Sequence, residues 1–327
     1  MSSETILQSM FSAMLVVTVI RVTTPILLAS LGGLISDLVG VTNIALEGIM
    51  LSAALAGVVA SAASGSSLVG LVVGVLVGAL LALTLAYFHL SLGADCILTG
   101  LAINMLAAGG TVFVLYSLTR DKAFSTGLKS ISLPSVQIPL LEKVPFIGEI
   151  ISGHNIMTYI AFVLVPIVSF FLYHTKPGIH LRGVGENPKA AEAVGVNVGR
   201  IRYGALVLSG VLAALGGINL SMGYLNLFVK DMTAGRGFIA LAAVYLGGRM
   251  PLGTMYAALL FGLADALASQ LGSLNIPPQF VLSIPYLTTV VALVVYSVQR
   301  RKRGASAISA ARRRGATDRT KDGCRVG

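Results

Sequence analysis

Long apolar runs separated by short polar segments dominate this sequence. A helix needs about 20 residues to cross about 30 Å of hydrocarbon, so apolar stretches near that length predict membrane spans. The stretches that reach it, bounded by charged residues or by Gly, Pro and Asn, are residues 22–40, 42–62, 67–89, 94–118, 155–174, 201–223, 252–271 and 279–298. The pattern predicts an all-α fold, a polytopic transmembrane helical bundle.

Two further apolar stretches do not fit a complete span. Residues 237–248 are too few to cross the bilayer at about 1.5 Å per residue, so they form half of a broken helix or continue into the turn beside them. Residues 5–20 have a mixed, partly amphipathic pattern before Arg21 and Pro25, which favours a helix lying in the membrane interface over a full span. With these stretches the bundle has roughly eight to ten spans, some of them broken.

Composition excludes a soluble globular protein. Only 11% of the residues are charged, whereas about 25% is usual in soluble domains, and mean hydropathy is +0.88. Hydrophobic residues make up 55% of the chain beside 37 glycines, more apolar surface than a packed core can hide from water.

The net charge of +10 is concentrated at one end of the chain. Residues 300–327 hold ten Lys or Arg and two Asp directly after an apolar stretch, which is typical of a cytoplasmic anchor and not of a nucleic-acid-binding arm. We therefore divide the chain into a transmembrane domain, residues 1–299, and a basic cytoplasmic tail that we expect to be disordered. No nucleic-acid partner is predicted.

Lys and Arg in the loops predict the orientation. Loop 175–200 and its flank are rich in basic residues, so we place this loop in the cytoplasm. Loop 119–154 has a mixed charge that is allowed on the outer side. Counting spans from these loops puts the N-terminus outside and the C-terminus inside.

No pattern of catalytic or metal-binding residues is recognisable. The four histidines have no metal-ligand spacing, and Cys96 and Cys324 indicate neither a disulfide framework nor a metal site. No Ser or Cys has an evident base, and the chain lacks the G-x-x-x-x-G-K-[ST] loop that would bind ATP phosphates. We predict no catalytic residue, no metal and no cofactor bound by this chain, which is not an enzyme.

Small residues recur every fourth position within the spans. One such row is Gly70, Gly74 and Gly78, and another contains Ser209 and Gly217. Because close backbone approach supplies much of the association energy between helices in lipid, we interpret these rows as packing seams.

Polar residues within the spans are candidates for a substrate pathway, because such residues are costly in lipid. Residues 40–43 indicate a break, after which Asn43 is placed to cap a helix and Glu47 lies in its first turn. Asp37 lies before the same break. Either structural capping or contact with a solute explains these residues.

Three more polar residues have competing explanations. Asn104 is suited to a nucleobase edge or a sugar hydroxyl and equally to a bond between helices. Asp265, near the middle of its span, fits a hydrogen bond in the bundle interior or a pathway role, whereas Asp95 is best explained as a partner of a helix N-terminus. Aromatic residues near the breaks belong to the interfacial belt or stack on a base; they are Tyr224, Phe228 and Tyr245.

The segment GENPKAAEAVG, residues 185–195, predicts a short capped helix over 188–194. Asn187 is a favoured N-cap, Pro188 suits the first helical position, and Gly195 supplies a left-handed stop. Two turns cannot stand alone, so this helix must dock on something. It is the only self-contained element predicted between long spans on the cytoplasmic side, either a connector at the interface or a coupling helix for a cytoplasmic partner.

Several motifs in order resemble one family over residues 22–298. They are NIALEG at 43–48, GENPKAAEAVG at 185–195, SGVLAALGG at 209–217 and AGRGFIALAAVYLGGRMPLG at 234–253. This set is similar to the permease subunits of bacterial ABC importers of the ribose and nucleoside type, nearest to the shorter permease of purine-nucleoside uptake systems. The Arg-rich extension from residue 300 departs from that pattern.

The resemblance implies a subunit of the bacterial inner membrane with three kinds of partner. These are an ATPase subunit that binds ATP, a second and different permease, and an extracytoplasmic solute-binding protein, with lipid around the bundle. The segment at 187–195 then becomes the coupling helix. The residues expected to couple to the ATPase are Glu186, Asn187, Pro188, Lys189, Glu192 and Gly195.

The predicted function is translocation of a neutral polar solute. A nucleoside is favoured as this solute over a simple sugar such as ribose. The candidate pathway residues are Asn43, Glu47, Asn104 and Asp265. The alternative of another class is a secondary transporter driven by an ion gradient, with Asp265 or Glu47 as its carboxylate. Such a transporter needs no coupling helix.

Overall fold

The structure is a computed structural model that describes residues 13–128, 130–137, 152–271 and 294. Its helices are α2 (Ala13–Leu38), α3 (Leu46–Ser64), α4 (Ser67–Ala86), the π-helix η1 (Tyr87–Ser91), α5 (Cys96–Thr119), α7 (Ile156–His174), α8 (Lys176–Glu186), α9 (Pro188–Ala193), α10 (Val198–Ile218), the π-helix η2 (Asn219–Tyr224), α11 (Arg236–Leu246) and α12 (Pro251–Leu271). Among the described residues, 7 helices are long and apolar enough to cross a membrane. The predicted all-α transmembrane class is confirmed.

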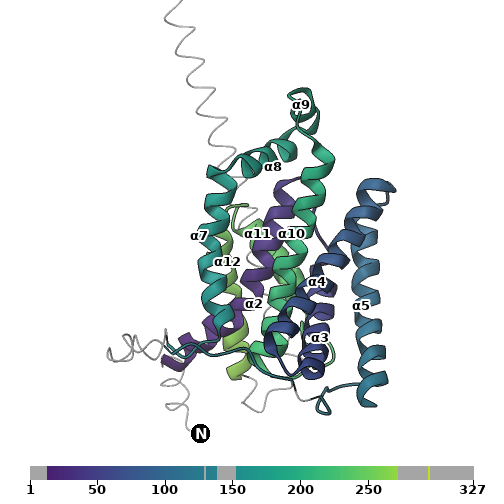
Figure 1. The fold of residues 1–327 in the computed structure, drawn as a ribbon. Helices are drawn as coiled ribbons and strands as arrows, with labels where there is room; N and C mark the ends of the chain where they lie inside the picture. Colours follow the sequence, from purple (N-terminus) through teal and green to yellow (C-terminus); the bar gives the residue numbers. More distant parts are fainter. Residues whose placement is uncertain (1–12, 129, 138–151, 272–293, 295–327) are drawn as a thin grey trace, which may run out of the picture.

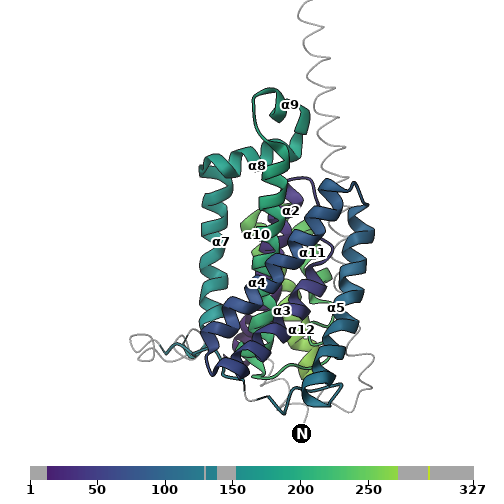
Figure 2. The same cartoon turned by 45° about the vertical axis from the view of Figure 1, so that its right-hand side comes forward.

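Helices α2 and α10 form the centre of the bundle (Figures 1 and 2). Helix α10 packs on α2, α3 and α4, and α2 also packs on α7, α11 and α12. In the most apolar part of the α10 span, 78% of the residues are buried. In the corresponding part of α5, which packs mainly on α3, only 22% are buried. Helix α5 therefore lies at the edge and offers most of its apolar surface to the surroundings.

The first span is longer than its predicted bounds of 22–40. Helix α2 is continuous from Ala13 past Arg21 and Pro25, so the described part of the predicted interfacial helix, 13–20, belongs to this span. The prediction rested on the mixed pattern of residues 5–20 before Arg21, and it was wrong because the helix carries Arg21 within it. The guanidinium of Arg21 stacks on Tyr224 and donates to its backbone oxygen, which satisfies the charged side chain inside the span.

The predicted break after the first span is present. The chain turns at Gly40, which has a φ of +86°, and becomes helical again only at Leu46. The second span therefore begins later than the predicted residue 42, because residues 41–45 are extended or turn-forming.

The short seventh stretch is confirmed as a helix too short to cross the membrane. Helix α11 has 11 residues and follows the non-helical segment 225–235, in which Phe228 and Thr233 are fully buried. Positive φ angles at Asn226, Asp231 and Ala234 let this segment turn within the bundle. Irregular backbone of this kind is tolerated in a membrane protein only where protein or a cavity surrounds it.

The ends of the helices define two faces of the bundle (Figure 1). Helices α8 and α9 lie at one end, whereas the start of α2 and the connection between α5 and α7 lie at the other. The described residues of loop 119–154 are thus on the opposite side from loop 175–200, as predicted. The predicted span 279–298, the tail 300–327 and residues 5–12 fall outside the described residues, apart from residue 294.

The predicted packing seams are confirmed. Gly70, Gly74 and Gly78 are the buried glycines of α4, and they lie against α3 and α10. A Cβ on Gly78 would overlap the Cβ of Ala214, and one on Gly217 would overlap the backbone oxygen of Met50. Glycine at these positions sets the distance between the helices.

We expect Gly217→Ala to lower the stability of the bundle by about 1–3 kcal/mol, because the added methyl group forces α10 away from α3. The loss of monodisperse protein after heating, followed by size-exclusion chromatography in detergent, measures this effect. The matched control is Gly109→Ala on α5, where nothing lies within 4 Å of the added carbon, and it should not lower the melting temperature. Equal melting temperatures for the two variants would contradict the seam.

Candidate polar centre and connecting helices

The first turn of α3 receives its hydrogen bonds from a neighbouring helix. Asn104 of α5 accepts a bond from the backbone N–H of Gly48 at 2.8 Å and donates to the backbone oxygen of Ile44 at 2.9 Å. The first N–H groups of a helix have no partner within it, so this amide acts as a cap supplied from outside. These two bonds agree with the explanation of Asn104 as a bond between helices.

Asn43 lies next to this cap. Its Oδ1 accepts a hydrogen bond from the N–H of Ala45, and its Nδ2 donates to the hydroxyl of Ser209 on α10, each at 3.0 Å. The residue in the N-cap position of α3 is Ala45, so Asn43 does not cap the helix directly. Instead it closes the turn that precedes the helix and ties that turn to α10.

Glu47 joins the beginnings of two helices. It lies in the first turn of α3, and its carboxylate accepts hydrogen bonds from the N–H groups of Gly235 at 2.8 Å and Gly237 at 2.6 Å, at the start of α11. A carboxylate is favoured there because the N-termini of both helices carry partial positive charge. A Cβ on Gly237 would be 2.5 Å from the nitrogen of Glu47, so the glycine permits this approach.

Asp265 continues the same set of contacts. It pairs with Arg236, the first residue of α11, with 2.9 Å between Nη2 and Oδ2, and only about a fifth of each side chain is exposed. Arg236 also donates to the backbone oxygen of Met232. The pair fixes α12 to the start of α11, which is the bundle-interior explanation proposed for Asp265.

The structure therefore brings the four predicted pathway residues into one connected group. Asn43, Asn104 and Glu47 surround the beginning of α3, and Asp265 reaches the group through Arg236. We call this group, Asn43, Glu47, Asn104, Arg236 and Asp265, the polar centre. Each member has a protein partner, and the group holds together α3, α5, α11 and α12.

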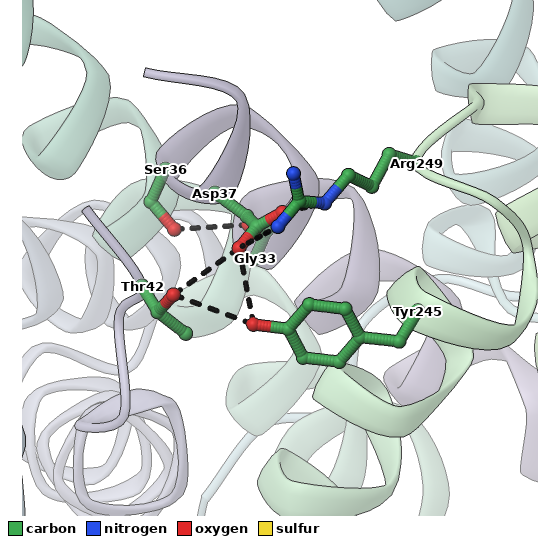
Figure 3. Close-up of polar contacts among 6 residues, drawn as sticks. All are labelled: Gly33, Ser36, Asp37, Thr42, Tyr245 and Arg249. Atoms are coloured by element: carbon green, nitrogen blue, oxygen red, sulfur yellow. Dashed lines mark hydrogen bonds and ion pairs between the residues drawn. The ribbon is translucent and has the colours of Figure 1, made fainter. Parts of the chain in front are cut away.

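A second polar cluster lies near the end of α2 (Figure 3). The carboxylate of Asp37, whose side chain is 3% exposed, pairs with Arg249 at 2.7 Å and accepts hydrogen bonds from Thr42 and Tyr245, each at 3.1 Å. Tyr245 is thereby placed in a hydrogen-bonded cluster and not in an aromatic belt. The cluster connects α2 to the break after it and to the turn between α11 and α12.

The predicted short helix is present at the end of the bundle. Helix α9 covers Pro188–Ala193, and the side chain of Asn187 accepts a bond from the N–H of Ala190 at 3.1 Å as its N-cap. Gly195 has a φ of +83°, and the N–H of Val196 reaches the backbone oxygen of Ala191. This bond closes a Schellman motif, so both predicted helix signals are confirmed.

Helix α8, which precedes α9, was not predicted. Thr175 caps it and Pro177 lies in its first turn, signals that are readable in the sequence, but three glycines within it lower its helix propensity. Two of these glycines allow close contacts, since a Cβ on Gly178 would overlap the backbone of α7 and one on Gly185 would overlap that of Leu38. The prediction that α9 is the only helix between the long spans is therefore wrong.

Helices α8 and α9, which connect α7 to α10, contact the rest of the bundle on one side only. Helix α8 spans from the end of α7 to the end of α2, and a cavity of about 340 Å³ lies beside it, lined by Asp37, Thr42, Arg182, Glu186 and Arg249 among others. In α9 only Ala191 is buried. Glu186, Lys189 and Glu192 are exposed and free to meet another protein.

Two further predictions concern single residues. Asp95 is the N-cap of α5 and accepts a bond from the N–H of Leu98 at 2.9 Å, as predicted. Phe228 is fully buried, and Tyr224 lies under the guanidinium of Arg21 at 3.8 Å. Neither aromatic ring is a free stacking surface.

Sequence reasoning missed the arginines that pair with the acidic residues. Arg236 and Arg249 flank the short apolar helix α11, and a cation beside an apolar helix needs a partner. From this requirement, the ion pairs of both arginines could have been predicted. Among the described residues there is no group of three or more His, Cys, Asp or Glu that could hold a metal ion.

Comparisons with known proteins agree with this architecture. Residues 15–296 match the family described as branched-chain amino acid transport system, permease component. The guanosine ABC transporter permease NupQ of Bacillus subtilis is 35% identical over 82% of this chain and 87% of its own length. The nucleoside ABC transporter permease NupC of Lactococcus lactis is 32% identical over 84% and 89%.

A third relative and one solved structure extend the comparison. TsgC13 of Haloferax volcanii, named as a candidate glucose ABC transporter permease, is 34% identical over 89% of this chain and 93% of its own. The fold resembles a metal-chelate-type ABC transporter in an inward-facing conformation, with a TM-score of 0.50, 17% identity and 85% of each chain covered. Because the family match covers most of the residues, this chain belongs to the family of branched-chain amino acid transport system permease components.

Proposed function

We propose that this chain is the transmembrane permease subunit of an ATP-driven importer and that its solute is a nucleoside. The role as a permease subunit is supported by the capped, exposed helix α9 on one face of a membrane-spanning bundle. The names of NupQ and NupC support a nucleoside as the solute, and the name of TsgC13 supports a sugar as the second candidate.

The contacts of the polar centre argue against an ion-coupled secondary transporter. Such a transporter needs a carboxylate that gains and loses a cation. Asp265 is held by Arg236, and Glu47 is occupied by two backbone N–H groups. Both carboxylates therefore have structural partners, and we assign the polar centre to the scaffold, with the solute pathway elsewhere.

The proposal includes separate partners for energy, pathway and delivery. An ATPase subunit hydrolyses ATP, a second and different permease completes the pathway, and an extracytoplasmic binding protein presents the solute. The broad apolar exposure of α5 supports a second membrane subunit or lipid beside this chain. We place the complex in the bacterial inner membrane, with the basic loop 175–200 in the cytoplasm and the N-terminus outside.

We further propose that α9 transmits the movement of the ATPase to the bundle through α8. Gly185 of α8 touches the end of α2, next to the break at Gly40 and the Asp37 cluster. A push on α9 would reach this break through the contact of Gly185 with Leu38, and it would also reach α7 and α10, on which α8 packs. The exposed Glu186, Lys189 and Glu192, together with Pro188 and the caps Asn187 and Gly195, would form the surface that meets the ATPase.

The orientation predicts which side of the membrane can label α9. In sealed cells, Lys189→Cys should react with a membrane-impermeant maleimide only after permeabilisation, because the exposed residue faces the cytoplasm. Lys122→Cys, in the loop at the opposite end, is the matched control and should react from outside. The reverse pattern would overturn the orientation.

The solute is tested by uptake into cells that carry the complete importer. Labelled guanosine or adenosine should accumulate only when the ATPase subunit is active, and excess unlabelled ribose or glucose should compete poorly. Competition by a sugar, with no uptake of nucleoside, would transfer the assignment to the sugar candidate. Uptake that persists with an inactive ATPase subunit would point to ion coupling.

Gly195→Val should uncouple the importer. The left-handed φ of +83° is disfavoured for a β-branched residue by about 1–2 kcal/mol, and nothing lies within 4 Å of the added carbon, so the effect arises from the backbone alone. We expect normal membrane insertion with a parallel loss of uptake and of solute-stimulated ATP hydrolysis. Gly183→Val on α8, in equally open space, is the control. Full transport by Gly195→Val would reduce α9 to a connector.

A further inference from the structure

A polar cavity lies at the end of the bundle opposite α8 and α9. Its volume is about 350 Å³, and α2, α7, η2 and the segment 132–135 contribute to its wall. Its lining includes Arg21, Asn155, Thr158, Asn219, Gly223 and Tyr224. No predicted pathway residue lines this cavity, so it is separate from the polar centre.

Arg21 brings a positive charge without a paired carboxylate. Its guanidinium stacks on Tyr224 at 3.8 Å from the ring centroid, and Nη2 donates to the backbone oxygen of Tyr224 at 3.4 Å. Within the described part of the chain Arg21 forms no ion pair, and neither Asp nor Glu lines the cavity. The remaining N–H groups of the guanidinium are available to an anion.

Asn219 adds an amide that the protein leaves unpaired. The residue is 4% exposed and lines the cavity, and its side chain makes no hydrogen bond within the described residues. Its amide therefore keeps a donor and an acceptor that a ligand in the cavity can use. Asn219 follows α10 directly, where the helix changes to the π-helix η2, a feature frequent at functional sites.

Gly223 keeps the amides accessible. A Cβ at this position would lie 2.6 Å from Oδ1 of Asn219 and 3.3 Å from Nδ2 of Asn155. The glycine therefore leaves room in front of two amide groups on one wall. Thr158 contributes a hydroxyl that also accepts a hydrogen bond from Thr24.

The cavity lies where the spans end. Arg21 is seven residues into the span that begins at Met14, which is roughly 10 Å along the helix. Asn155 is the N-cap of α7, and Tyr224 is the last residue of η2. Arg21 thus starts deeper than the other two residues, and its long side chain extends to Tyr224 at the end of the spans, beside which phospholipid headgroups reside.

We infer that this cavity binds a phosphate group. Arginine is the preferred side chain for phosphate, and amide and hydroxyl donors complete its coordination, whereas an acidic residue would repel it. Phosphate at this depth comes either from the headgroup of a membrane phospholipid or from a free phosphate in the aqueous phase. The volume exceeds that of phosphate alone and accommodates the glycerol ester of a headgroup.

The full-length chain, purified in detergent and stripped of lipid, tests the inference. Native mass spectrometry should detect one bound phosphatidylglycerol, and diacylglycerol with the same acyl chains should not bind because it lacks phosphate. Arg21→Gln and Asn219→Leu should each weaken binding roughly tenfold, the loss expected for one bond to a charged group. Arg120→Gln, at an exposed position on the same end of the bundle, is the control.

The two sources are separated by competition. If millimolar inorganic phosphate displaces the lipid and its own binding is weakened by Arg21→Gln, free phosphate is the ligand. If inorganic phosphate does not displace the lipid, the phosphate of the lipid headgroup is the ligand. Arg21→Lys keeps the charge and should retain more binding than Arg21→Gln, which separates a lost contact from a misfolded protein. Absence of lipid and phosphate binding in the native chain, or equal binding in every variant, would overturn the inference.

Discussion

Helices that begin inside the bundle leave backbone N–H groups without partners, and this constraint organises the structure around α3 and α11. Water is scarce at that depth, so other parts of the chain must supply the acceptors. Asn104 supplies one for α3, and Glu47 supplies two for α11. Because Glu47 itself stands in the first turn of α3, the two helix starts are locked to each other, and the pair of Arg236 with Asp265 adds α12 to the same point.

Sequence reasoning reached those parts of the fold that local signals determine. Apolar stretches predicted the long helices, a short stretch predicted the short helix α11, and Asn187 with Gly195 predicted the two ends of α9. Each of these signals acts within a few residues. The beginning of α2 was misplaced because Arg21, which marked the predicted boundary, is accommodated within the helix by Tyr224. Helix α8 was missed because its glycines lower helix propensity while they allow close contacts with α7 and α2.

The partners of the acidic residues lay beyond such reasoning. Asp37 and Arg249 are 212 positions apart, so their pairing depends on the packing of α2 against α11 and α12. The same is true of Glu47 and the turn before α11. Residue type identified the acidic residues as noteworthy, but only the fold shows that they hold helices together. In this structure, charged groups that are costly in a membrane span therefore mark contacts between helices as much as points where a solute passes.

The glycine seams also determine which parts of the bundle are able to move. Where Gly78 faces Ala214 and Gly217 faces the backbone of Met50, no long side chain can change rotamer to absorb a displacement. Helices α3, α4 and α10 must therefore translate and rotate as a single rigid body. Alternating access in this chain would then arise as hinge motion at the edges of that body, at the peripheral helix α5 and at the non-helical segment 225–235.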